Sequence, residues 1–197
     1  MAKAMSGQKA VTPSADGLAA SVQAAAPRGI PPVDQWNPPF CGDLDIRVAR
    51  DGTWYYLGSP INRFKLVQLF SSILKKEGDA YFLVTPVEKV GITVEDAPFV
   101  ATDFDVTGGA EAPAITFTTH VGDRATAGPD NPIRVTFDPD TGEPSPYILI
   151  RRNLEALIDR KSFYRLVDLG EEKDGWFGVR SAGTFFPIMA VDALELN

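Results

Sequence analysis

The clearest pattern in the sequence is an alternation of apolar and polar side chains that begins at residue 43. Leu44, Ile46 and Val48 point to one side of an extended chain, and acidic or basic residues point to the other. This period of two is typical of a half-buried β-strand. Asp51-Gly52 then supplies residues that tolerate positive φ, which predicts a two-residue hairpin turn into a second strand at 53–57.

The register of this hairpin decides which side chains share its outer face. A two-residue turn places Arg47 opposite Tyr56 and Ala49 opposite Trp54. The side chains that then point the same way are Asp45, Arg47, Trp54 and Tyr56. Aromatic rings beside an arginine and an acid suit recognition of a ligand or peptide by stacking, cation–π contact and a charge-assisted hydrogen bond. This face is therefore a candidate binding surface.

A proline-rich segment precedes the hairpin and competes for the same face. The four prolines of residues 31–40 remove backbone donors and hold the chain extended. Trp36 and Phe40 are expected to pin this segment onto the core. If it packs on Trp54 and Tyr56, the candidate surface is lost. A proline-rich ligand for an aromatic groove is the other interpretation.

Two helices are predicted from apolar spacings of three and four residues. The first covers 62–76 with Asn62 as its cap, and the second covers 153–169 with Asn153 as its cap and a break or kink at Ser162. Their apolar positions are Leu66, Leu69, Phe70 and Ile73 in the first, and Leu154, Leu157, Ile158, Phe163, Leu166 and Val167 in the second. Further strands are expected at 81–84, 90–94, about 98–106, 114–121, 133–138 and 147–151, and a last hairpin joins 176–180 to 184–188.

The elements occur twice in the same order, which indicates an internal repeat. Ile46-Arg47-Val48 and Ile133-Arg134-Val135 each open a series of turn, strand, helix and strand pair. We therefore expect an α+β fold of two similar β-hairpin–helix–β-hairpin units, with mostly antiparallel sheets each covered by one main helix. The expected boundaries are an N-terminal α+β domain at 31–97 and a C-terminal α+β domain at 98–197.

Residues 1–30 are expected to form a disordered or weakly ordered tail. They are rich in Ala, Ser, Gly and Gln and carry few large apolar side chains, so burial does not offset the entropy of ordering them. Alanine propensity supports a short helix from Leu18 to Ala26, but an isolated helix of this length is marginal in water. The folded part is therefore expected to begin near residue 31.

Composition and charge narrow the class of protein. Of the 197 residues, 44% are hydrophobic and 23% are charged, which is ordinary for a globular protein. The net charge of −7 disfavours nucleic-acid binding, because phosphate backbones need clustered Lys and Arg. No stretch approaches the roughly 20 apolar residues that span a bilayer, and the N-terminus lacks the apolar region of a signal peptide. We expect a soluble cytoplasmic protein that binds neither nucleic acid nor membrane.

The residues that usually carry chemistry are scarce. Cys41 is the single cysteine and His120 the single histidine, so no disulfide, zinc site or serine- or thiol-type catalytic group is expected. The glycine patterns of dinucleotide and P-loop sites are absent. Paired carboxylates could act as acid and base, although solvated positions explain them more simply; they are Asp43/Asp45, Glu95/Asp96 and Glu171/Glu172. We expect no catalytic residue, no metal and no cofactor.

Several long strings in the sequence match a known family. They lie at 31–56, 59–63, 83–90 and 94–99, and the first of them contains Pro-Pro-Val-Asp-Gln-Trp-Asn-Pro-Pro-Phe. Together they resemble the bacterial family known as domain of unknown function 1285, over about residues 31–190. The resemblance implies a two-part α+β fold with repeated motifs and a link to signal transduction. It implies no catalytic residues.

The sequence as a whole predicts a non-enzymatic module that binds a small molecule or a protein through the first sheet and the 85–89 loop, with a role in signal transduction. One alternative is a hydrolase-like enzyme, in which Glu88, Glu95 or Asp96 has to meet Asp43 or Asp45 in one cleft. Another is a structural subunit whose surface serves homo-oligomerisation. The candidate ligand-binding residues are Asp43, Asp45, Arg47, Trp54, Tyr56, Glu88, Lys89, Glu95 and Asp96.

Overall fold

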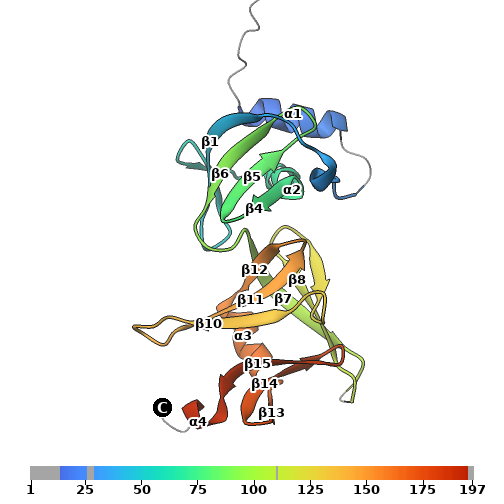
Figure 1. The fold of residues 1–197 in the computed structure, drawn as a ribbon, viewed down its shortest axis with the longest axis vertical. Coiled ribbons are helices and arrows are strands. Elements are labelled where there is room, and N and C mark those ends of the chain that lie inside the picture. The colour runs from blue at the N-terminus through green and yellow to red at the C-terminus, as the bar shows by residue number, and fades with distance from the viewer. Residues whose placement is uncertain (1–13, 26–28, 110, 195–197) are drawn as a thin grey trace, which may run out of the picture.

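The computed structural model describes residues 14–25, 29–109 and 111–194, and most of this chain is β-sheet (Figure 1). Two six-stranded sheets follow one another from the N-terminal end, and a three-stranded sheet lies at the C-terminal end. The helices are few and short. The fold is therefore largely β-sheet and less helical than the expected α+β fold, because strands form in part of the chain where apolar spacing predicts helices.

Each unit is defined by its elements. The first unit contains α1 (Ala15–Ala25), the 3₁₀ turn η1 (Val33–Gln35), β1 (Phe40–Val48), β2 (Trp54–Tyr56), β3 (Ser59–Pro60), α2 (Phe64–Ser72), β4 (Leu74–Glu77), β5 (Ala80–Val84) and β6 (Lys89–Val94). The second contains β7 (Phe99–Thr107), β8 (Ala114–Thr119), β9 (Arg124–Thr126), β10 (Ile133–Phe137), β11 (Pro144–Arg151), β12 (Leu154–Ile158) and α3 (Arg160–Val167). The small sheet contains β13 (Glu171–Lys173), β14 (Trp176–Ser181) and β15 (Thr184–Ala190), followed by α4 (Val191–Leu194).

The two large sheets share one topology. Each consists of two three-stranded meanders, joined in the middle where the first strand of the unit runs parallel to the last. The order is β3-β2-β1-β6-β5-β4 in the first sheet and β9-β8-β7-β12-β11-β10 in the second. A repeat is therefore present, but its unit is a pair of meanders. The triplets at 46–48 and 133–135 lie on β1 and β10, which occupy different places in their sheets.

The first predicted helix ends early, at Ser72. From Leu74 the chain forms β4 and pairs antiparallel with β5, because the turn at Gly78 folds these two segments together. The helix cap is Arg63, which makes no side-chain capping bond, and Asn62 is not the cap. The predicted range therefore contains one helix and one strand.

The second predicted helix is also divided, into β12 and α3. The side chains buried in alternation along β12 are Leu154, Ala156 and Ile158. Asp159 then caps α3, since its carboxylate accepts a 2.7 Å hydrogen bond from the backbone N–H of Ser162. The chain therefore changes structure at Asp159, three residues before the expected break, and Asn153 is not a helix cap.

The first hairpin forms, but its register differs by one residue from the predicted one. A three-residue loop at 50–52 joins its strands, with Gly52 at a φ of +87°. The observed partners are Arg47 with Tyr55 and Val48 with Trp54. A shift of one residue moves every side chain of a strand to the other face. Trp54 is therefore 1% exposed and stacks on Phe70 of α2, with 6.3 Å between ring centres.

Helix α1 packs on the first unit, in a stretch that composition assigns to a tail. Leu18 and Val22 are fully buried in the same core as the first sheet, and the intermediate Trp36 also packs there, as expected. A few apolar side chains on one face are therefore enough to hold the helix in place, because they pack into the core of the first unit. Of the expected tail, residues 1–13 and 26–28 lie outside the described residues.

Candidate functional site

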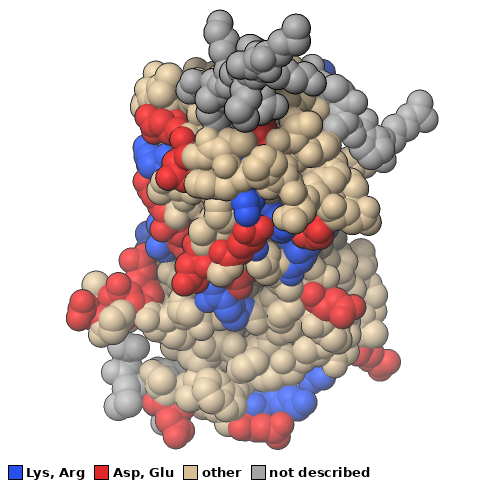
Figure 2. All heavy atoms as spheres, turned by 45° about the horizontal axis from the view of Figure 1, so that its top comes forward, with Lys and Arg blue, Asp and Glu red and all other residues tan. Residues whose placement is uncertain are grey.

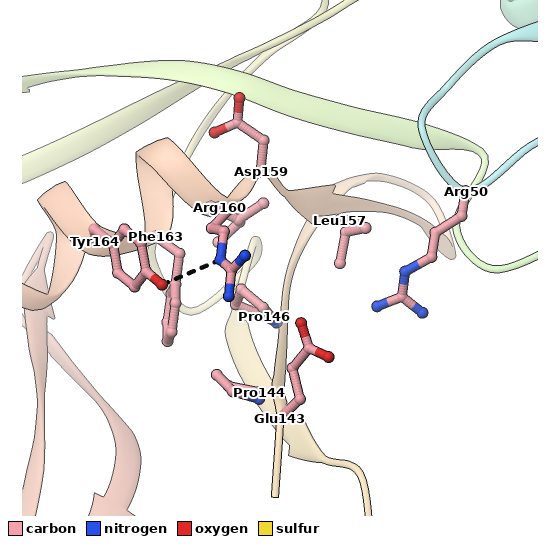
Figure 3. A pocket seen from close by; sticks show the side chains of 10 residues that line it. Arg50, Glu143, Pro144, Pro146, Leu157, Asp159, Arg160, Phe163 and Tyr164 are labelled. Carbon is pink, nitrogen blue, oxygen red and sulfur yellow. Dashed lines mark hydrogen bonds between the residues drawn. The ribbon is translucent and has the colours of Figure 1, made fainter. Parts of the chain in front are cut away.

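A pocket of about 200 Å³, which we call the α3 pocket, opens between α3, the strands β11 and β12, and the loop from β1 to β2 (Figure 3). The loop belongs to the first unit and the other elements to the second, so the pocket is completed across their junction. Both apolar and charged side chains form its walls. The lining residues are Arg50, Glu143, Pro144, Pro146, Leu157, Ile158, Asp159, Arg160, Phe163 and Tyr164.

Arg50 reaches this pocket from the turn of the first hairpin. Its backbone N–H donates to Glu95 Oε2 at 3.0 Å, and its Nη2 donates to Ser145 Oγ at 2.9 Å. Its Nη1 lies 3.1 Å from Asp96 Oδ2 as an ion pair without hydrogen-bond angles, so this buried oxygen accepts no hydrogen bond among the described residues. Arg50 is therefore held at its backbone and its tip, while 58% of its side chain stays exposed.

Asp96 joins the two units through Tyr147 of β11. The phenol Oη donates to Asp96 Oδ1 at 2.8 Å, and burial together with this bond raises the pKa of Tyr147. The guanidinium of Arg134 lies 4.1 Å from the centre of the Tyr147 ring and donates two 2.6 Å hydrogen bonds to Glu155, which raise the pKa of Arg134. A row of alternating charges therefore crosses the junction beside the pocket.

Arg160 stands on the first turn of α3, on the opposite side of the pocket from Arg50 (Figure 3). Its Nε donates to Tyr164 Oη at 3.1 Å, and the residue is exposed. The Asp159 carboxylate caps the helix and points away from the pocket (Figure 3). Glu143 forms no ion pair with any described residue. Two guanidinium groups and one carboxylate are thus the charges available to a ligand.

The arrangement offers an anion both charged and apolar partners. Planar guanidinium groups bind carboxylate or phosphate through paired, charge-assisted hydrogen bonds, and Pro146, Leu157 and Phe163 supply apolar walls. The ionisable lining residues are Arg50, Glu143, Asp159, Arg160 and Tyr164. The volume lies below the roughly 300–1,000 Å³ of sites for drug-sized ligands, which points to a smaller molecule.

The predicted site residues on the outer face of the first sheet include Asp45, Arg47 and Glu95. Arg47 forms an ion pair with Glu95 and lies 4.2 Å from the centre of the Tyr55 ring. The hydrogen bond from the Arg50 backbone, and then the one from the Arg47 side chain, lower the pKa of Glu95. Asp45 is exposed two residues before Arg47 on the same strand face. This face therefore carries a satisfied ion pair, and Asp45, Arg47 and Glu95 are not among the residues that line the α3 pocket.

The predicted aromatic cluster does not form on that face. Trp54 is buried, and Tyr56 packs partly buried against the same core. Both belong to the face opposite Asp45 and Arg47, because the three-residue loop shifts the register. Tyr55 takes their place as the aromatic neighbour of the arginine.

Asp43 lies farther along the outer face of β1. Its carboxylate folds over Gly91 of β6, at a point where any Cβ would collide with it. Phe40 meets Phe82 edge to face, with 6.1 Å between ring centres, and is 54% exposed. The prediction that Phe40 pins the proline-rich segment to the core is wrong, because β1 begins at this residue and turns the ring outward.

Lys89 is the first residue of β6, and Glu88 directly precedes it. The Lys89 ammonium forms a 2.9 Å ion pair with Glu77 and lies 4.8 Å from the centre of the Phe82 ring. Glu88 acts through its backbone, since its carbonyl accepts from the N–H of Thr85 at 2.9 Å and closes the turn. Neither residue lines the α3 pocket.

Asp43 and Glu95, one of the acid pairs considered for hydrolysis, lie far apart. The Glu95 backbone pairs with Val48, which stands five residues after Asp43, so about 16 Å of strand separates the two acids. Asp96 faces the second unit, where Tyr147 holds it. Acid–base pairs in glycosidases lie about 5–9.5 Å apart. Of the nine predicted site residues, two contact the pocket wall, since both Glu95 and Asp96 contact Arg50.

Sequence reasoning missed the pocket residues because they come from three separate segments of the chain. Arg50, Pro146 and Arg160 share no local pattern that would place them together. One usable pattern was present at Asp159, which stands three residues before Ser162 and marks a helix start. That pattern would have located the first turn of α3, and with it Arg160.

Charged groups are interspersed over the visible surface. Figure 2 shows acidic and basic side chains side by side across the middle of one face, in keeping with the ion pairs described above. In the described ranges, no three His, Cys, Asp or Glu side chains gather as a metal site. The helices of those same ranges are too short or too polar to cross a bilayer.

Comparison with known proteins gives consistent matches. The family model "Domain of unknown function (DUF1285), N-terminal domain" matches residues 31–97, and "Protein of unknown function (DUF1285), C-terminal domain" matches 98–188. A crystal structure of a DUF1285 family protein from Silicibacter pomeroyi DSS-3 is 64% identical with a TM-score of 0.86, over 92% of this chain and 100% of that one. Another, from Shewanella baltica OS155, is 30% identical with a TM-score of 0.50, over 64% and 91%. No curated protein matches.

Proposed function

This chain belongs to the DUF1285 family, a family of unknown function, and from that premise we propose that it is a non-enzymatic binding protein for small organic anions. The ligand occupies the pocket between α3, β11, β12 and the Arg50 loop. Its carboxylate or phosphate meets the two guanidinium groups, and its apolar body packs on Leu157 and Phe163. Binding of this kind needs no nucleophile or metal.

One observation carries the proposal. Arg50 of the first unit and Arg160 of the second line the same small pocket beside apolar side chains. Each guanidinium already makes one hydrogen bond, to Ser145 Oγ or Tyr164 Oη, and retains further N–H groups for a ligand. Glu143 disfavours a second negative charge on the ligand, so a monoanion binds better than a dianion.

Binding also bears on a signalling role. Arg50 is shared between Asp96, Ser145 and the pocket, so a ligand that draws its guanidinium inward weakens the contact to Asp96. Asp96 in turn holds Tyr147 of the second unit. Occupancy of the pocket is thereby linked to the junction of the units, which is the coupling a ligand sensor needs.

Titration calorimetry with benzoate, and with uncharged benzamide as the matched neutral compound, tests this function. Benzoate should bind, and Arg50→Gln and Arg160→Gln should each weaken it about tenfold or more, since charge-assisted hydrogen bonds contribute roughly 1.5–3 kcal/mol. Glu143→Gln should strengthen it by removing a like charge. Arg124→Gln is the control, because Arg124 pairs with Asp105 and does not line the pocket.

Two results would overturn the proposal. If the pocket recognises the negative charge, benzamide should bind more weakly than benzoate. Equal affinities for the two compounds would therefore contradict the proposal. Unchanged benzoate affinity in both pocket variants would place any binding elsewhere on the protein.

A further inference from the structure

A second site lies at the far end of the first unit, where α1 runs beside α2. The inner face of α1 is buried through Ala15, Leu18 and Val22. Two hollows of about 300 and 350 Å³ remain along its flank and share Asp16, Arg63 and Leu66 in their walls. They are therefore neighbours that form one groove, which we call the α1–α2 groove.

The two walls of the α1–α2 groove differ in chemistry. The wall that α1 provides carries short side chains, which are Ala15, Asp16, Ala19 and Ala20. The other wall carries larger apolar side chains; they are Tyr56, Ile61, Leu66 and Leu69. Because the short side chains do not reach across, apolar surface stays open along the groove, and such surface favours a partner.

The rim of the groove is basic. Arg63 and Lys65 line it, both are exposed, and neither forms an ion pair with any residue that the structure describes. Asp16 is the one acid in the lining. The cations therefore remain available to acidic side chains of a partner.

The elements at the groove favour a helix over a strand as its occupant. β3 is the edge strand of the first sheet, but it has only two residues, and one of them is Pro60. A short edge that contains proline is a poor template for an added strand. A pair of neighbouring helices instead accepts the ridge of a third helix, whose side chains at i and i+4 stand about 5–6 Å apart and can enter adjacent hollows.

We propose that the α1–α2 groove binds an amphipathic helix of a partner protein, with bulky apolar residues facing the groove and acidic residues facing Arg63 and Lys65. This surface is separate from the α3 pocket, since the two linings share no residue. The apolar residues supply the buried area and the acids fix the orientation, as in other helix-in-groove complexes.

Fluorescence anisotropy with the full chain and a labelled synthetic helix tests this site. The probe carries Leu at i, i+3, i+4 and i+7 with Glu on the flanks; a scrambled peptide and a version with Lys for Glu are its controls. The Glu probe should bind, and the scrambled peptide should not. Arg63→Glu with Lys65→Glu should weaken the Glu probe at least tenfold and strengthen the Lys version. Arg124→Glu with Lys173→Glu, away from the groove, should leave both unchanged.

A groove-filling variant gives a second readout. Ala19→Phe should weaken binding of the Glu probe while circular dichroism shows an intact fold. If Ala19→Phe does not fold, the charge-reversal pair still tests the groove, because it changes only surface residues. Equal binding of the scrambled peptide, or no exchange of preference on charge reversal, overturns the proposal. So does self-association of the chain that the charge reversal abolishes, since the occupant is then a second copy.

Discussion

The guanidinium of Arg151 donates a 2.6 Å hydrogen bond to the main-chain oxygen of Ser71, and so ties the end of α2 to β11 of the second sheet. The same group forms an ion pair with Asp123 and lies 4.8 Å from the centre of the Phe99 ring. Only 12% of the Arg151 side chain is exposed, and this burial lowers its pKa. The two units are therefore joined through a buried charge as well as through apolar contact.

Arg151→Met should lower the free energy of unfolding by about 3–5 kcal/mol, because breaking a buried ion pair leaves Asp123 and the Ser71 oxygen without their partner. Urea denaturation measures the loss. Arg124→Met is the matched control, since its ion pair with Asp105 is exposed on both sides and should contribute no more than about 1 kcal/mol. Equal losses in the two variants would contradict a special role for Arg151.

His120 should make stability depend on pH. Its Nδ1 accepts a 3.1 Å hydrogen bond from Val100 N–H, and its Nε2 is buried beside Gly52. Burial lowers the pKa of His120 below its ordinary value of 6.5, so protonation favours the unfolded chain. The stabilisation is fully present above that value and falls as the pH drops below it. Thermal unfolding at a series of pH values should show this slope, and His120→Gln should remove it.

The carboxylates provide the internal control for that experiment. Hydrogen bonds lower the pKa of several acids, so their stabilisation is present above the unfolded pKa near 4 and is lost only below it. These acids are Asp51, Glu77, Glu95, Asp103 and Asp138. A slope just below pH 6.5 that persists in His120→Gln would assign the effect to another group.

Gly52→Ala should both destabilise the protein and weaken anion binding. Gly52 has a φ of +87°, and an added Cβ would lie 3.1 Å from Val100 Cγ2. Gly58 is a matched control, because its φ is +74° and its Cβ would meet open space. Left-handed backbone costs about 1–2 kcal/mol at either site. Calorimetry should therefore show a larger loss for Gly52→Ala, with reduced benzoate affinity because the Arg50 loop shifts.

The hairpin register predicts opposite outcomes for adjacent aromatic residues. Trp54→Ala should cost about 3–5 kcal/mol, since it removes a buried ring that stacks on Phe70. Tyr55→Ala, on the outer face beside Arg47, should change stability by about 1 kcal/mol or less. Denaturant unfolding of both variants measures the difference. A large loss for Tyr55→Ala and a small one for Trp54→Ala would restore the predicted register.

Local patterns in the sequence located most strands but not their exact partners. The alternation at Leu44, Ile46 and Val48 identified β1 and its buried face, and this prediction is confirmed. The turn was harder, because Asp51-Gly52 fits both a two-residue loop and a three-residue loop with glycine last. Only the packing of Trp54 against Phe70 distinguishes them. One residue of register was enough to misplace the candidate binding surface.

The error at 154–158 has a different cause. The apolar residues at 154–158 satisfy helical spacing, yet pairing with the parallel strand β7 selects the extended form for this segment. That contact joins Ala156 to Phe99, which no local window contains. The same limitation hid the pocket, since Arg50 and Arg160 come together only through the junction of the units. Elements set by nearby residues were predictable, and those set by distant pairing were not.

The parallel pairing in the middle of each large sheet has a consequence for how the protein opens. Within each meander the strands are neighbours in sequence, so closing them costs little loop entropy, whereas the β1–β6 and β7–β12 pairings close nearly a whole unit. Each unit thus consists of two meanders that are joined at one parallel strand pair. The amide protons that form hydrogen bonds across this pair should exchange with solvent together, when the two meanders separate. Amide protons within a meander should remain protected.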